Sequence, residues 1–165
     1  MISGSIQRMT PLKGNLTDMT SKLDPQFNDP RFSTRVEITV PFHDADSMGV
    51  VWHGNYFRYL EVAREQLLKQ FDYGYRQMLA SGYVWPIVDT RLKYIAPVVF
   101  EQRIEVRAQL EEIENRLRIG YQIFDIETGK RTTTGYTLQV AVDATTKEMC
   151  FVSPQVLFDK TGVSL

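Results

Sequence analysis

Hydrophobic residues along this chain recur with two different periods. Between residues 35 and 40 every second residue is apolar, because Val36, Ile38 and Val40 alternate with charged or hydroxyl side chains. This period of two is typical of a strand with one buried face. Further on, apolar residues recur every three or four positions, the spacing of one helix face; they are Tyr56, Leu60, Ala63, Leu67 and Phe71. The spacing predicts a helix over 55–71 and a further turn of helix over 75–80.

Four more strands are predicted after this helix. Apolar and polar residues alternate over 84–94, 103–110, 116–124 and 131–142. The connections at 112–115 and 127–130 are short, so consecutive strands should be antiparallel neighbours. A turn over 143–147 follows, and we expect a short strand and a tail after it.

This order of elements predicts an α+β fold. A helix with a single apolar stripe needs one large surface to cover it, and a curved antiparallel sheet provides that surface. We therefore expect one domain over 35–165. Residues 1–34 contain three prolines and no sustained hydrophobic period, so we expect them to form an extended or partly disordered N-terminal arm.

Composition narrows the class of protein. The apolar fraction of 43% and the charged fraction of 24% are ordinary for a globular domain. The net charge of -1 lacks the basic excess of a nucleic-acid-binding protein, and no segment approaches the roughly 18–20 apolar residues of a membrane span. A single cysteine, Cys150, rules out an internal disulfide and fits a reducing compartment. These features predict a cytoplasmic protein that binds no nucleic acid and does not span a membrane.

The densest group of chemically versatile residues lies between the first strand and the helix. Both histidines of the chain, His43 and His53, fall in this run together with Asp44 and Asp46. A carboxylate can act as a base or a nucleophile, and the free N–H groups at the start of a helix can hold a developing negative charge. Carboxylates and histidines in front of a helix therefore indicate hydrolytic chemistry.

Structural interpretations of the same residues stay open at this point. Asp46 could cap the helix or accept hydrogen bonds from turn amides. Asp44 is expected to be the structural member of the pair, His43 to face solvent or the strand edge, and His53 could simply hold the loop. The four side chains are of metal-ligating types, but their spacing matches no metal-binding motif. We therefore predict no metal site.

The run from residue 42 to residue 56 resembles a motif of the hotdog-fold thioesterases; it reads FHDADSMGVVWHGNY. The closest resemblance is to the branch with 4-hydroxybenzoyl-CoA thioesterase and the Tol-Pal-associated acyl-CoA thioesterases. There a strand ends in aromatic-x-Asp-x-Asp-x-x-Gly-Val-Val-x-His-x-x-Tyr, and the helix carries Glu-x-Ala-Arg, here Glu61 to Arg64. A weaker similarity extends over 35–154. The resemblance implies a hotdog fold, in which a curved antiparallel five-stranded sheet wraps around one long central helix.

The resemblance also implies roles for single residues. Asp46 matches the catalytic carboxylate, as nucleophile or general base, and the backbone N–H near His53 would stabilise the oxyanion. The His53 side chain matches a histidine that aromatic-substrate members often replace, which favours aliphatic acyl groups, whereas Phe42 replaces a tyrosine of many acyl-CoA members. The residues expected to contact substrate are Gly49, Val50, Asn55, Tyr56 and Glu61, with Lys93, Lys130 and Arg131 as candidates for the nucleotide phosphates. Glu61 could equally pair with Arg64 on the helix surface.

The expected function is hydrolysis of an acyl-CoA thioester to a carboxylic acid and free CoA. The resemblance implies a homodimer joined through its sheet edges, often doubled into a tetramer, with no cofactor because coenzyme A is part of the substrate. Two alternatives stay open: a thioesterase acting on acyl carrier protein-bound intermediates of a biosynthetic pathway, and a non-catalytic acyl-binding hotdog module. A hotdog dehydratase is less compatible, because the motif belongs to the thioesterases.

Overall fold

The computed structural model describes residues 29–164, so most of the predicted N-terminal arm lies outside the described residues. Two short 3-10 helices, η3 (Phe42–Asp44) and η4 (His53–Asn55), flank the motif loop. The helices are α2 (Tyr56–Gln70), α3 (Tyr75–Ala80) and α4 (Gln155–Thr161), and the strands are β1 (Ser33–Thr39), β2 (Tyr83–Val84), β3 (Ile87–Tyr94), β4 (Arg103–Glu112), β5 (Leu117–Asp125), β6 (Arg131–Gln139) and β7 (Val142–Asp143). No helix in this part of the chain is long and apolar enough to cross a membrane.

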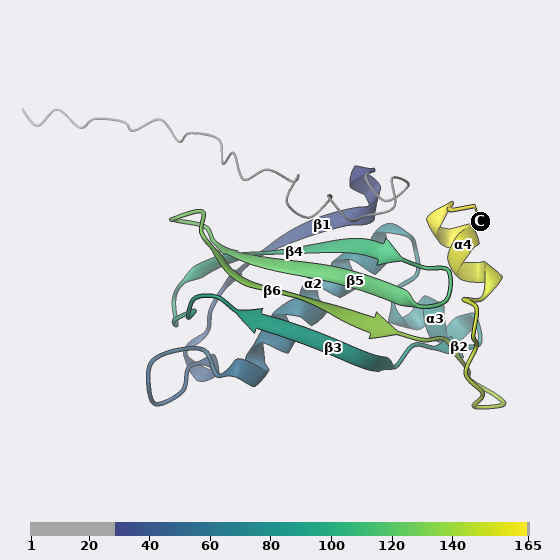
Figure 1. The fold of residues 1–165 in the computed structure, drawn as a ribbon, viewed down its shortest axis with the longest axis horizontal. Helices are drawn as coiled ribbons and strands as arrows, with labels where there is room; N and C mark the ends of the chain where they lie inside the picture. Colours follow the sequence, from purple (N-terminus) through teal and green to yellow (C-terminus); the bar gives the residue numbers. More distant parts are fainter. Residues whose placement is uncertain (1–28, 165) are drawn as a thin grey trace, which may run out of the picture.

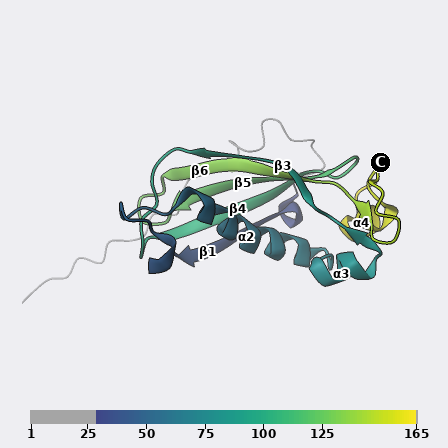
Figure 2. The same ribbon diagram turned by 90° about the horizontal axis from the view of Figure 1, so that it is seen from below.

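Five strands form one antiparallel sheet in the order β1-β4-β5-β6-β3. The helix α2 runs along one face of this sheet, as Figures 1 and 2 show, and packs mainly on β1 and β4. The residues of the predicted apolar stripe are all buried against the sheet, with exposed fractions of 8% or less. The predicted five-stranded sheet around a long central helix is therefore confirmed.

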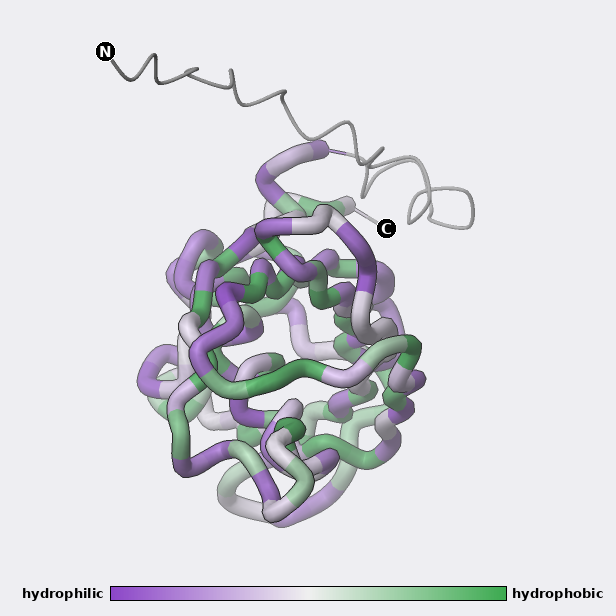
Figure 3. The backbone as a smooth tube through the Cα atoms, turned by 90° about the vertical axis from the view of Figure 1, so that its left-hand side faces the viewer, coloured by the Kyte–Doolittle hydropathy of each residue, from purple (hydrophilic) through white to green (hydrophobic). Residues whose placement is uncertain are grey.

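The two faces of the sheet differ in chemistry. Val106 and Ala108 of β4 belong to the core under α2, so the residues between and beside them point the other way. That outer face carries ion pairs, with nitrogen–oxygen distances of 3.1 Å for Arg103–Glu37 and 2.5 Å for Arg107–Glu105. The alternation is visible along the chain in Figure 3, where hydrophobic and hydrophilic positions follow one another. One face of the sheet therefore packs under α2, whereas the other face carries charged side chains.

Three predicted boundaries are corrected by the structure. β1 begins at Ser33, two residues before the predicted start, and Phe32 is already fully buried, with its ring stacked on Phe71 at 5.6 Å. The predicted strand over 84–94 is divided into β2 and β3 around Pro86, which cannot donate to a ladder. The predicted strand over 131–142 is likewise divided, because β7 leaves the main sheet to pair with β2.

The C-terminal segment is a helix, whereas the sequence predicted a short strand and a tail. α4 follows Pro154, whose fixed φ suits a helix start, and it ends at Gly162, whose φ of 68° is left-handed. Leu157, Phe158 and Val163 are buried by this arrangement. The helix closes the end of the molecule opposite the motif loop, as Figure 1 shows.

Candidate active site

The motif loop over 45–51 is a tight, self-bonded turn at the N-terminal end of α2. The Asp46 amide donates to the Val50 carbonyl at 2.8 Å, and the Gly49 amide donates to the Asp46 carbonyl at 3.0 Å. Gly49 has a φ of 78°, which residues with a Cβ rarely adopt. Two contacts anchor the loop to the segment after β3: the Val51 amide donates to the Val98 carbonyl at 2.7 Å, and Val50 bridges to Val99. The loop backbone is therefore fixed from both sides.

Asp46 is exposed at the tip of this loop. Its Oδ1 accepts a hydrogen bond from the Met48 amide at 2.8 Å, and within residues 29–164 that amide is the only donor to the carboxylate. The side chain does not cap α2, because the helix begins ten residues later, after η4. Asp46 therefore fulfils one structural interpretation, an Asx turn, and keeps its second oxygen available for chemistry.

Asp44 has the opposite environment, two residues earlier. Its side chain is 3% exposed; Oδ2 accepts from the Tyr59 hydroxyl at 2.7 Å and Oδ1 accepts from Arg58 at 3.2 Å. The sequence predicted a structural Asp44 that accepts from turn amides; the donors to its carboxylate are instead side chains of α2. His43 lies 3.6 Å from the same carboxylate and is exposed, in line with its expected place. Burial, and then the hydrogen bond to Asp44, raise the pKa of Tyr59, so this hydroxyl stays a donor.

The start of the helix presents backbone amides beside the loop. The first N–H groups of a helix have no acceptor within it, which applies to His53 and Gly54 of η4. The Tyr94 hydroxyl donates to the His53 carbonyl at 2.8 Å, and because the peptide is planar and trans this bond also orients the Gly54 N–H. A Cβ on Gly54 would lie 2.2 Å from the Trp52 ring, so glycine is needed for that ring to cover the turn. The Gly54 amide, next to His53, is thus held in a defined direction.

Other predicted site residues are placed more peripherally. The Asn55 side chain donates to the Asp44 carbonyl at 3.0 Å, and Tyr56 is buried with its ring against Tyr94 at 4.9 Å. Both therefore hold the loop and helix together from inside. Glu61 pairs with Arg64, the alternative that the sequence left open.

The predicted phosphate-binding residues are not brought to the loop as one group. Lys93 lies next to Tyr94 on β3, so its side chain points to the outer face of the sheet. Lys130 is exposed in the turn before β6, and Arg131 is the first residue of that strand. Their role in binding CoA stays a prediction.

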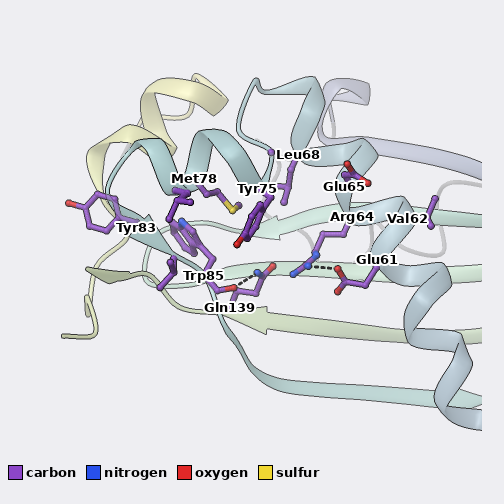
Figure 4. Close-up of a pocket in the computed structure, with 13 residues that line it drawn as sticks. Glu61, Val62, Arg64, Glu65, Leu68, Tyr75, Met78, Tyr83, Trp85 and Gln139 are labelled. Atoms are coloured by element: carbon purple, nitrogen blue, oxygen red, sulfur yellow. Dashed lines mark hydrogen bonds and ion pairs between the residues drawn. The ribbon is translucent and has the colours of Figure 1, made fainter. Parts of the chain in front are cut away.

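A cavity of about 410 Å³ lies against the C-terminal half of α2, as Figure 4 shows. Its walls come from α2, α3, β2 and the end of β6, and they include Arg64, Tyr75, Met78, Trp85 and Gln139. Sequence reasoning placed Tyr59 in the core stripe of the helix but did not identify this cavity, the contact of Tyr59 with Asp44, or Tyr94. Tyr59 had a visible signal, since it lies three residues after Tyr56 on the same helix face. Tyr94 had none beyond its position at a strand end.

The chemistry available here is that of an exposed carboxylate on the loop that leads into the helix start. An exposed Asp46 can take a proton from water or attack a carbonyl, and the amides at the helix start can hold the resulting oxyanion. Among residues 29–164, no three histidine, cysteine or carboxylate side chains gather in a way that could hold a metal ion.

Two solved structures of at least 25% identity share the fold of this chain. The DHNA-CoA thioesterase of Staphylococcus aureus superposes with a TM-score of 0.67 at 28% identity, covering 72% of this chain and 80% of that one. The hypothetical protein TT1821 of Thermus thermophilus superposes with a TM-score of 0.70 at 26% identity, covering 79% and 99%.

Two curated relatives are similar over the region of the fold. A putative esterase of Synechocystis sp. is 33% identical over 109 residues, which is 66% of this chain and 66% of the relative, so the match spans about two thirds of that protein. The 1,4-dihydroxy-2-naphthoyl-CoA hydrolase of Thermosynechococcus vestitus is 30% identical over 118 residues, covering 70% of this chain and 74% of the relative. Residues 40–158 match the model of the thioesterase-like superfamily. The chain therefore belongs to the thioesterase-like superfamily, which confirms the predicted hotdog thioester hydrolase at the level of the family.

Proposed function

We propose that this protein hydrolyses acyl-CoA thioesters with Asp46 as its catalytic carboxylate. The observation that carries the proposal is the contrast between the two motif aspartates: Asp44 is buried and paired, whereas Asp46 is exposed and singly hydrogen-bonded, on the loop that precedes the helix start. Two relatives support the substrate class: one of Bacillus subtilis named as a putative acyl-CoA thioesterase, and the 1,4-dihydroxy-2-naphthoyl-CoA hydrolase. Placement in the branch of 4-hydroxybenzoyl-CoA and Tol-Pal-associated enzymes is part of the proposal.

The proposed mechanism uses few groups. Asp46 either removes a proton from the water that attacks the thioester carbonyl, or attacks that carbonyl itself to form an anhydride that water then opens. The N–H groups of His53 and Gly54 hold the oxyanion, and the Tyr94 hydroxyl keeps the peptide that carries the Gly54 N–H in place. In either route the carbon–sulfur bond breaks as the tetrahedral intermediate collapses, which in the second route is the step that forms the anhydride, and CoA leaves as a thiolate, which needs little acid assistance because a thiol is fairly acidic. No cofactor beyond the CoA of the substrate is proposed.

A homodimer is proposed for the working enzyme. β3 is an edge strand of the sheet, seven of its eight residues are exposed, and its apolar side chains include Ile87 and Val88. A long edge strand of this kind is usually covered in a native protein. Pairing of β3 with its copy would cover it and place Tyr94 and the adjacent loop near the subunit boundary. Association of two such dimers into a tetramer stays a prediction, as does a cytoplasmic location.

Replacing Asp46 by asparagine tests the function directly. Asparagine keeps the acceptor for the Met48 amide, so the loop should hold its shape, and thiol release from a panel of acyl-CoAs should fall by about 10²–10⁴-fold. Asp125→Asn is a matched control, because Asp125 Oδ1 also accepts from the amide two residues on, at 3.0 Å, and this residue lies at the end of β5, outside the motif. Near-complete activity of a folded Asp46→Asn protein would contradict the assignment. If the protein hydrolyses thioesters of acyl carrier protein but none of CoA, the carrier protein takes the place of CoA in the proposed substrate.

A further inference from the structure

The edge strand β3 presents two chemically different faces. Leu92 packs against the core and the Tyr94 ring packs against a ring of α2, so both side chains lie on the α2 side of the sheet. Side chains alternate along a strand, and Asp89, Arg91 and Lys93 therefore point to the outer face. β3 lies at the edge of the sheet, as Figure 1 shows, and β6 is its only strand neighbour in the described part of the chain. The other side of its backbone is open for a further strand.

The charges on this outer face are open toward the edge. The Tyr136 hydroxyl donates to Asp89 Oδ2 at 3.2 Å, which holds the carboxylate and leaves its other oxygen available. Arg91 and Lys93 are exposed and form no ion pair or side-chain hydrogen bond with another described residue. Along β3 the order of charge is thus negative, positive, positive. A second copy running antiparallel presents the reverse order, so it can place opposite charges side by side.

Few alignments of two such copies are possible. Residues opposite each other in a sheet point to the same face, so the two-fold axis passes between a residue and its own copy. With Asp89 or Lys93 on the axis, like charges face each other. With Leu92 on the axis, Arg91 faces the partner's Lys93, and with Arg91 on the axis two guanidinium groups oppose. Only with Thr90 on the axis does Asp89 face the partner's Arg91, twice, with no like charges opposite.

The alignment on Thr90 also covers the strand and brings the partner to the candidate site. β3 extends over Ile87–Tyr94, and this alignment pairs residues 87–93 of each copy. At the ends of the paired segment, Leu92 meets the partner's Val88, a side chain that is 58% exposed in the single chain. The first residues of the partner's β3 then lie beside Tyr94, whose hydroxyl orients the Gly54 peptide.

We propose that two copies pair through β3 with Thr90 opposite the partner's Thr90, and that the ion pair between Asp89 and the partner's Arg91, formed twice, sets this register. The proposal rests on the homodimer proposed above and adds the contacts that align it. Because Tyr94 ends the same strand, the register decides which part of the partner lies against the residue that orients the Gly54 amide. The ion pair therefore connects assembly to the candidate site.

Disulfide trapping tests the register directly. In a Cys150→Ser background, which removes the single cysteine of the chain, Thr90→Cys places two thiols opposite each other. Their Cα atoms should then be about 5.5 Å apart, within the range of a disulfide. In a glutathione redox buffer most of this protein should become a cross-linked dimer. Leu92→Cys, on the same face, is the matched control: its two thiols are four positions out of register and should stay unlinked.

Charge exchange tests the ion pair. Arg91→Asp puts like charges opposite each other twice, and the dimer Kd measured by sedimentation should rise by about tenfold or more. Asp89→Arg should have the same effect. The double exchange Asp89→Arg with Arg91→Asp restores opposite charges and should return Kd to within about threefold of wild type. Lys93→Gln is the control, because Lys93 faces no charge in this register, and it should leave Kd within about threefold.

The outcomes separate this inference from the function on which it rests. A dimeric protein in which Thr90→Cys does not cross-link, or in which the double exchange fails to restore Kd, overturns the register while the dimer stands. A wild type that is monomeric but releases thiol from acyl-CoA overturns the dimer and the register and leaves the hydrolase standing. A Thr90→Cys dimer that forms as expected, with no thioester hydrolysed by wild type, supports the register and contradicts the proposed function.

Discussion

Removing the Tyr59 hydroxyl should weaken the base of the motif loop. This hydroxyl donates to Asp44 Oδ2 at 2.7 Å, and both residues are almost fully buried, at 3% and 2% exposed. A hydrogen bond to a charged group contributes about 1.5–3 kcal/mol, and its loss leaves a buried carboxylate oxygen without a donor. The Arg58–Asp44 pair offers little compensation, because Arg58 is 67% exposed and such pairs contribute about 0–1 kcal/mol. Tyr59→Phe should therefore lower the free energy of unfolding by about 2 kcal/mol.

Urea unfolding followed by circular dichroism measures this change, with a thermal scan in which Tm should fall by roughly 5–8 °C. Tyr94→Phe is the matched control, since the Tyr94 hydroxyl donates to a backbone carbonyl and its side chain is 44% exposed; it should cost at most about 1 kcal/mol. A double-mutant cycle with Asp44→Asn should return a coupling energy of about 1–3 kcal/mol. If Tyr59→Phe stays within about 0.5 kcal/mol of wild type, or the coupling is near zero, the buried pair does not hold the loop.

Two further predictions concern the rest of the fold. Phe32→Ala should destabilise the protein by about 3–5 kcal/mol, because Phe32 is fully buried and stacked on Phe71; a loss below about 1 kcal/mol in urea unfolding would place the start of the domain after this residue. Burial raises the pKa of Tyr56, Tyr59 and Tyr121 above the unfolded value of 10.0. The stability from these protonated hydroxyls is complete below pH 10 and is lost as pH rises through 10 toward the folded values. Unfolding midpoints should therefore fall between pH 9 and 11, less so in Tyr121→Phe, and a constant midpoint would contradict this.

The helices and strands that could be predicted from sequence are those with a regular spacing of apolar residues along the chain. The stripe from Tyr56 to Phe71 needs only helical spacing to be recognised, and α3 over Tyr75–Ala80 lies where the spacing placed it. The alternation in β4 and β5 likewise reports one buried face, because their inward residues are fully covered by α2 and the core. Such patterns depend on nearest neighbours along the chain, which is why one sequence was sufficient.

What the sequence could not give depends on residues far apart in the chain. β2 pairs with β7, matching Tyr83 to Asp143 and Val84 to Val142, and nothing local distinguishes these two short strands from the longer strands beside them in the sequence. The bond between Gln139 and the Trp85 carbonyl joins residues separated by 54 positions, so the cavity could not be inferred. α4 was missed for another reason, since its seven residues are too few for a helical period to be convincing.

The two aspartates of the motif show how local sequence assigns chemistry only when the third dimension is added. Asp44 and Asp46 are identical side chains two positions apart. η3 turns Asp44 inward to the Tyr59 and Arg58 side chains, which hold its carboxylate as a structural acceptor. The turn closed by Gly49 then reverses the chain, so Asp46 is left at the surface with one amide donor and one open oxygen. If the catalytic role were assigned to Asp44 and the structural role to Asp46, the reactive carboxylate would be a buried one that no substrate can reach. Burial, which the spacing alone does not reveal, therefore decides which carboxylate can react.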